Sequence, residues 1–174
     1  EIDDLVFGSL ATAEAVLTNK QKELGCALLN IGGATTSLIV YEEGEVLHTA
    51  VIPVGSDHIT CDIAIGLRIS IDTAENIKRE YGSLNAKDIS SKTELDLSQL
   101  NSLEEGSVSL KYVSQIIEAR VEEIFDKVEI ELKKIGRNGI LPAGIVLTGG
   151  GSKLAGMIDL AKKRLKLPSS AAAV

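Results

Sequence analysis

Two glycine-rich segments have the composition needed to bind phosphate groups. The first contains Gly32 and Gly33, followed by the hydroxyl side chains of Thr35 and Thr36, and lies between two apolar runs. Glycine lets the backbone turn tightly and approach a ligand closely, so the N–H groups and threonine hydroxyls of such a loop can surround phosphate oxygens. An ordinary hairpin turn is the alternative interpretation of this motif taken alone.

The second segment follows the apolar run 144–148 and precedes a helical pattern over residues 153–165. A helix N-terminus directly after several glycines favours an anionic ligand. If the strands before the two segments belong to one sheet, the loops will converge, as in many nucleotide clefts. The residues of this second loop that can contact a ligand are Gly149, Gly150, Gly151 and Ser152.

The hydrophobic pattern predicts the elements that must position these loops. The longest is a helix whose apolar residues recur every three or four positions from Val113 to Ile135, with Gly136 ending it. At 1.5 Å per residue this helix would be about 40 Å long. Its charged face is explained by exposure to solvent. The other predicted elements are a helix within 5–17, strands at 25–31, 35–41 and 45–54, and two helices for which Ser56 and Ser70 are the expected N-caps.

Composition excludes several classes of protein. Among 174 residues, 44% are hydrophobic and 25% are charged, which is typical of an ordinary globular domain. The net charge of −7 argues against nucleic acid or anionic membranes as partners. Cys26 and Cys61 lie in apolar patterns and are expected to be buried, reduced thiols, as in a cytosolic protein. The sequence does not start with Met, and we expect it to be a fragment.

Three segments carry a resemblance to a known superfamily. The turn from Asn30 to Ser37, the segment 147–152 and the stretch 48–55 resemble the actin/Hsp70 ATPases. Within that superfamily, the stretch from His48 to Ala64 is similar to the bacterial cell-division family FtsA. The resemblance implies an α/β fold: the second lobe of an actin-like (ribonuclease H-like) protein, with a mixed sheet flanked by helices and a small inserted α+β outer subdomain.

The resemblance also divides the chain. The expected units are a connecting segment from a first lobe (1–24), an actin-like subdomain holding half of a nucleotide site (25–82 plus 139–168), an outer subdomain for partner docking (83–138) and a disordered tail (169–174).

The resemblance implies that both glycine loops contact ATP. It also places Glu75 and Lys78 against the ribose and adenine, although their spacing alone indicates a surface ion pair contributing about 0.3 kcal/mol. Asn30 stands where hydrolysing members have an aspartate, and a neutral amide is a poor ligand for Mg²⁺. We therefore expect at most a weak, water-mediated metal contact at Asn30, no catalytic residue, and at most weak ATPase activity in the intact protein.

ATP and Mg²⁺ are expected cofactors of the intact protein only. The phosphate loop of the first lobe has no counterpart in this sequence, so half of the clamp around ATP is missing. We expect no tight nucleotide binding by this chain.

The resemblance implies partners as well. In FtsA-like proteins the outer subdomain docks the C-terminal tail of the tubulin-like protein FtsZ. Arg120 matches a basic position of that surface, and Lys111, near the start of the same helix, is expected to contribute to it. The intact protein is expected to link FtsZ filaments to the cytoplasmic face of the membrane at midcell, through a C-terminal helix absent from this sequence, and to self-associate in actin-like filaments. The alternative is an actin-like nucleotide-binding assembly subunit of type IV pilus machinery, which shares the glycine turn. His48 and His58 are expected to be structural.

Overall fold

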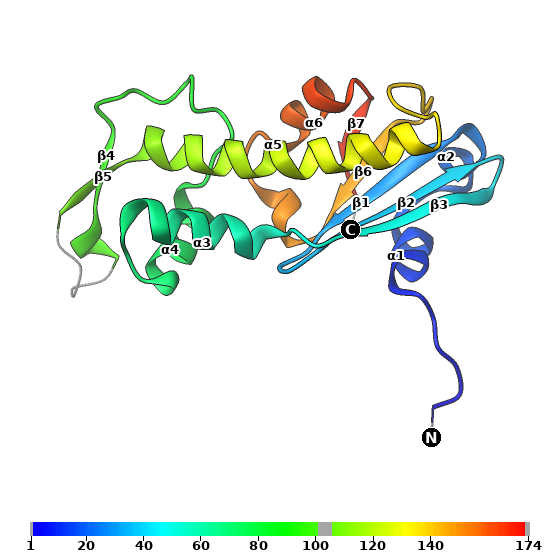
Figure 1. Cartoon of the computed structure of the whole chain (residues 1–174), viewed down its shortest axis with the longest axis horizontal. Coiled ribbons are helices and arrows are strands. Elements are labelled where there is room, and N and C mark those ends of the chain that lie inside the picture. The colour runs from blue at the N-terminus through cyan, green and yellow to red at the C-terminus, as the bar shows by residue number, and fades with distance from the viewer. Residues whose placement is uncertain (1, 101–105, 173–174) are drawn as a thin grey trace.

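A five-stranded mixed sheet forms one end of the molecule in the computed structural model, which describes residues 2–100 and 106–172 (Figure 1). The strand order is β3-β2-β1-β6-β7. The first three strands form an antiparallel meander, whereas β6 pairs parallel with β1 and β7 pairs parallel with β6. The strands are β1 (Cys26–Ile31), β2 (Thr36–Glu42), β3 (Glu45–Ile52), β6 (Ile145–Thr148) and β7 (Ser169–Ala171).

Both faces of this sheet are covered, which explains the nearly continuous apolar runs of its central strands. Ala27, Leu29 and Ile31 of β1 belong to the main core together with α5 (Leu110–Lys134) and α6 (Met157–Leu165). Leu28 points to the opposite face and packs with residues of α1 (Gly8–Val16). The expected fold, a mixed sheet flanked by helices, is confirmed.

The long helix α5 connects the sheet with the other end of the molecule (Figure 1). Its inward residues, from Val113 to Leu132, are fully buried, as the spacing predicts. Beside its first half lie α3 (Ser56–Leu67) and α4 (Ile71–Tyr81), next to a two-stranded sheet of β4 and β5 (Figure 1). The remaining elements are α2 (Asn19–Leu24), β4 (Glu94–Asp96), η1 (Leu97–Gln99), β5 (Ser107–Ser109) and η2 (Gly150–Lys153).

One core runs through the molecule. Residues of β1, α3, α4 and the whole length of α5 belong to the same buried cluster. The first half of α5 packs against α3, so the expected division at residue 82 separates elements that share this core. The outer subdomain at 83–138 therefore stays a prediction, and we describe the chain as one packed unit.

Four local expectations are corrected. α6 begins at Met157 rather than Lys153, because η2 and an extended Leu154 come first. Residues 169–171, expected to be disordered, form β7; residues 173–174 lie outside the described residues. Cys61 is exposed, unlike Cys26. Finally, α3 is capped by Gly55 rather than by Ser56.

The longest described helix, α5, carries many charged residues along its 25 positions. Within residues 2–100 and 106–172, no helix combines the length and the apolar character needed to cross a bilayer.

Candidate functional site: a cleft at the glycine loops and a groove between two helices

The two glycine segments lie side by side. Because β1 and β6 are parallel neighbours, Asn30 is paired in register with Thr148, and both loops leave the sheet at the same edge. A Cβ atom on Gly149 would lie 2.4 Å from Asn30 Oδ1, and one on Gly151 would lie 2.5 Å from Ile31 Cγ2. Only glycine permits this approach, and the predicted convergence of the loops is confirmed.

The first loop is held against the N-terminus of α3. The N–H of Gly32 donates to the Thr35 carbonyl over 2.9 Å, which closes the turn. The carbonyls of Gly32 and Gly33 accept the N–H groups of Ser56 and Asp57, over 2.8 and 2.9 Å. A Cβ on Gly55 would lie 2.2 Å from the Gly33 carbonyl oxygen, so this contact also requires glycine. The turn and α3 are therefore one rigid unit.

Two of the expected hydroxyl ligands make structural hydrogen bonds. Thr36 is fully buried and its hydroxyl donates to the Val54 carbonyl over 2.7 Å, and the contact of this hydroxyl with a phosphate stays a prediction. The hydroxyl of Ser152 donates to the Gly149 carbonyl over 2.7 Å and closes the second loop. Thr35 is exposed at the tip of the first turn, together with Gly33.

A cleft of about 490 Å³ brings four of the predicted nucleotide residues together. Glu75 and Lys78 of α4 form one wall, and the second glycine loop, through Gly150 and Gly151, forms another. The other lining residues were not predicted from the sequence, and they include the basic side chains of Arg79 and Lys153. Their positions in the sequence could have identified them, because Arg79 is four residues after Glu75 and Lys153 closely follows the glycines.

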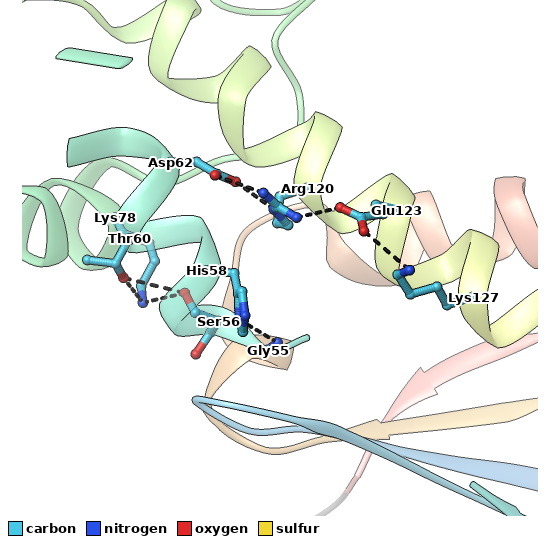
Figure 2. A network of polar contacts seen from close by, with 9 residues as sticks. All are labelled: Gly55, Ser56, His58, Thr60, Asp62, Lys78, Arg120, Glu123 and Lys127. Atoms are coloured by element: carbon cyan, nitrogen blue, oxygen red, sulfur yellow. Dashed lines mark hydrogen bonds and ion pairs between the residues drawn. The ribbon is translucent and has the colours of Figure 1, made fainter. Parts of the chain in front are cut away.

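Lys78 is the centre of a buried polar network at this cleft (Figure 2). Its side chain is only 7% exposed, and Nζ donates to Thr60 Oγ1 over 2.7 Å and to the Ser56 carbonyl over 3.2 Å. It also pairs with Glu75 Oε2 over 2.6 Å. Burial makes this more than the surface ion pair that the spacing indicates, because an ammonium group removed from water requires all of its partners.

Glu75 is ionised in the folded state. Partial burial acts to raise the pKa of its carboxyl, but hydrogen bonds from Lys78 and Thr60 outweigh that effect and lower the pKa below its usual range. The Thr60 hydroxyl lies 2.5 Å from Glu75 Oε2. The cleft is lined by two acidic side chains, Glu75 and Glu80, and by three basic ones, Lys78, Arg79 and Lys153.

We expect Glu75→Gln to lower the free energy of unfolding by about 1 kcal/mol at neutral pH, because buried Lys78 loses its counter-ion. Since the folded-state pKa of Glu75 is lowered from 4.5, its contribution is complete above that value and is lost as pH falls through the lower, folded pKa. Urea unfolding between about pH 3 and about pH 7 measures this pH dependence. An equal effect at every pH would contradict the expectation.

The second glycine loop borders two hollows. A second hollow of about 590 Å³ lies on the other side of Gly150 and is lined by Gly149, Ser152 and Lys153. A Cβ at Gly150 would meet nothing within 4 Å, so a ligand has space there. Within the described parts of the chain, no group of three His, Cys, Asp or Glu side chains could hold a metal. Asn30, with its amide oxygen beside Gly149, stays a predicted weak metal contact.

A separate groove of about 410 Å³ lies between α3 and α5. Arg120 of α5 lines it, and its guanidinium contacts Asp62 of α3 twice, Nε to Oδ2 over 2.6 Å and Nη2 to Oδ1 over 2.8 Å (Figure 2). Its Nη1 donates to Glu123 over 2.5 Å. The hydrogen bonds with Asp62 raise the pKa of Arg120 above its ordinary value. Lys111, the other predicted docking residue, does not line this groove.

The fold, the two glycine loops and the cleft beside them define an actin-like half-domain. Solved actin-like structures agree. MreB5 of Spiroplasma citri bound to ADP superposes with a TM-score of 0.74 and 24% sequence identity, over 92% of this chain and 52% of that one. The type IV pilus PilM–PilN complex superposes with a TM-score of 0.64 and 20% identity, over 88% of this chain and 37% of that one. At such identities the likeness establishes the fold alone.

The sequence comparisons are more specific. The family model for cell division protein FtsA matches residues 27–174. FtsA of Pseudomonas aeruginosa is 39% identical over 97% of this chain, and FtsA of Neisseria meningitidis is 40% identical over 95%. This chain belongs to the FtsA family of cell division proteins. It spans 40% of the length of each of these two relatives.

Proposed function

We propose that the chain is the second lobe of an FtsA-type division protein and that its groove between α3 and α5 docks the C-terminal tail of FtsZ. The observation that carries the proposal is the combination of apolar and basic groups in one hollow. Ile65, Gly66 and Ile116 form the apolar part, and Arg120 is the only cation among the residues that line the groove within the described chain. Ile65 is 76% exposed and its apolar surface is available to a partner.

Arg120 is the group of the groove that an acidic residue of the tail would bind, beside the carboxylates of Asp62 and Glu123, and apolar residues of the tail would contact the two isoleucines. The side chain of Arg120 is 26% exposed, and a partly desolvated guanidinium binds a carboxylate with two parallel hydrogen bonds. Tyr112 lies beside the groove: its hydroxyl is 3.7 Å from the place of a Cβ on Gly66. Tyrosine at such an edge supplies apolar area with a polar tip, as interface residues commonly do.

The cleft beside the glycine loops is half of the proposed ATP site. Gly150 and Gly151 supply backbone against the phosphates, while Glu75 and Lys78 lie where the ribose and adenine would bind. We expect no tight binding of ATP by this chain, because one lobe offers only part of the contacts and leaves the nucleotide exposed to water. For the intact protein, the same proposal includes Mg²⁺ as a cofactor, self-association in actin-like filaments, and attachment at the cytoplasmic face of the membrane.

A titration of the chain into a fluorescently labelled FtsZ C-terminal tail peptide tests the docking proposal. We expect saturable binding, at least about tenfold weaker for Arg120→Glu, because the reversed charge repels the acidic tail. A scrambled peptide controls for composition, and Lys20→Glu controls for net charge, since Lys20 is exposed on α2 and does not line the groove. No binding by the folded chain to the native tail peptide would refute the proposal.

The pilus-type assembly subunit, the alternative from the sequence, is not favoured. PilM shares the fold at 20% identity, whereas the FtsA family model and relatives at 39 and 40% identity cover almost the whole chain.

A further inference from the structure

The guanidinium of Arg120 is already occupied. Arginine has five N–H donors, and a carboxylate binds it best along an edge that offers two of them. One such edge, Nε with Nη2, is taken by both oxygens of Asp62. The other edge is partly taken, since Nη1 donates to Glu123. An incoming carboxylate therefore meets Asp62 on the Nε–Nη2 edge of Arg120 and Glu123 at Nη1.

Asp62 and Arg120 come from different helices and lie 58 positions apart in the sequence (Figure 2). Their side chains are 27% and 26% exposed, so the pair is partly shielded from water and stronger than a pair on the open surface. No other ion pair of Asp62 occurs among the residues that the structure describes. Glu123, by contrast, also pairs with Lys127 over 3.4 Å and can transfer to it.

We propose that Asp62 competes with the acidic ligand of this groove for Arg120. A peptide carboxylate binds the Nε–Nη2 edge of Arg120 only after it displaces Asp62. The inference rests on the proposed docking of an acidic tail between α3 and α5. Asp62 then acts as a specificity residue. It makes an acidic residue alone a poor ligand, because one carboxylate merely replaces another.

The apolar part of the groove supplies the remaining binding energy. Ile65 is one turn after Asp62 on α3, and Ile116 is one turn before Arg120 on α5. Both line the same hollow as the ion pair. A peptide that places an apolar side chain on these isoleucines gains energy that the exchange of carboxylates does not provide. The groove therefore selects peptides in which an apolar residue lies near an acidic one.

Removing the carboxylate of Asp62 tests this inference. We expect Asp62→Asn to tighten binding of the labelled FtsZ tail peptide by about threefold to tenfold, because the amide no longer neutralises Arg120. Asp126→Asn is the matched control: it makes the same change in charge on α5, but Asp126 pairs with Arg164 and does not line the groove. Its binding should stay within about twofold of the unchanged chain.

A second peptide, with its acidic residues replaced by the corresponding amides, isolates the competition. Asp62→Asn should give no gain with this neutral peptide, because nothing then competes for Arg120. An equal gain with both peptides, an equal gain from Asp126→Asn, or no gain at all would overturn the inference while leaving the docking proposal intact. Failure of every chain to bind either peptide would overturn both.

Thermal unfolding followed by circular dichroism shows whether each variant is folded. If Asp62→Asn does not fold, Asp62→Ser replaces it in the same titration. That variant also removes the carboxylate from the Nε–Nη2 edge of Arg120, so we expect the same gain of about threefold to tenfold for the acidic peptide and none for the neutral one. Equal binding of the acidic peptide to Asp62→Ser and to the unchanged chain would then refute the inference.

Discussion

Phe125→Ala is expected to lower the free energy of unfolding by about 3–5 kcal/mol. Phe125 has no exposed surface and is the largest fully buried side chain among the residues that the structure describes. It lies in the second half of α5, inside the core that joins this helix to the sheet. The change removes an aromatic ring from a closely packed interior, and the surrounding elements cannot close the cavity completely. Domains of this size are stable by only about 5–15 kcal/mol, so the variant is near the limit of folding.

The other phenylalanine of the chain provides the control. Phe7 precedes α1 and is 48% exposed, so Phe7→Ala should change the free energy of unfolding by no more than about 0.5 kcal/mol. Urea or guanidinium unfolding of both variants, followed by circular dichroism, gives the comparison. Similar losses at the two positions, or a loss below 1 kcal/mol for Phe125→Ala (against the ~3 kcal/mol expected), would show that α5 does not anchor the core as described.

The periodicity of α5 predicted its length and most of its buried face, because a helix that packs along its whole length keeps one apolar stripe. Phe125 and Ser114 escaped that prediction. Phe125 lies beside the stripe and widens it, while Ser114 is buried because its hydroxyl donates to the Ser83 carbonyl over 2.6 Å. Such a hydrogen bond between distant segments has no signature in the local sequence.

The chemistry of the two sites was predictable to different degrees. Glycine loops after apolar strands have a local signature, and the parallel pairing of β1 with β6 brought them together as expected. The partner of Arg120 has no such local signature in the sequence. Asp62 is on another helix, and only the packing of α3 on α5 brings it to Arg120. Likewise, the residue type of Thr36 does not reveal that its hydroxyl is buried and donates to the Val54 carbonyl.

Gly149→Ala is the second substitution with a large expected effect, about 3 kcal/mol or more of lost stability. Gly149 has φ +88° and ψ 168°, a region that residues with a Cβ hardly populate. An added Cβ would also lie 2.5 Å from the Ile31 carbonyl oxygen and 2.4 Å from Asn30 Oδ1. Either the loop or the end of β1 must move, and both belong to the edge of the sheet where the cleft begins.

The adjacent residue, Gly150, is the control for the substitution at Gly149. Gly150 does not have a positive φ, and a Cβ there would meet no atom within 4 Å. Gly150→Ala should therefore leave stability unchanged or raise it by up to about 1 kcal/mol, since alanine restricts the unfolded chain. Chemical unfolding of the two single variants measures the contrast. Equal losses would mean that the loop is intolerant of any side chain. A loss confined to Gly149 would mean that the close approach of the two loops fixes the edge of the cleft, with Gly150 left open for a ligand.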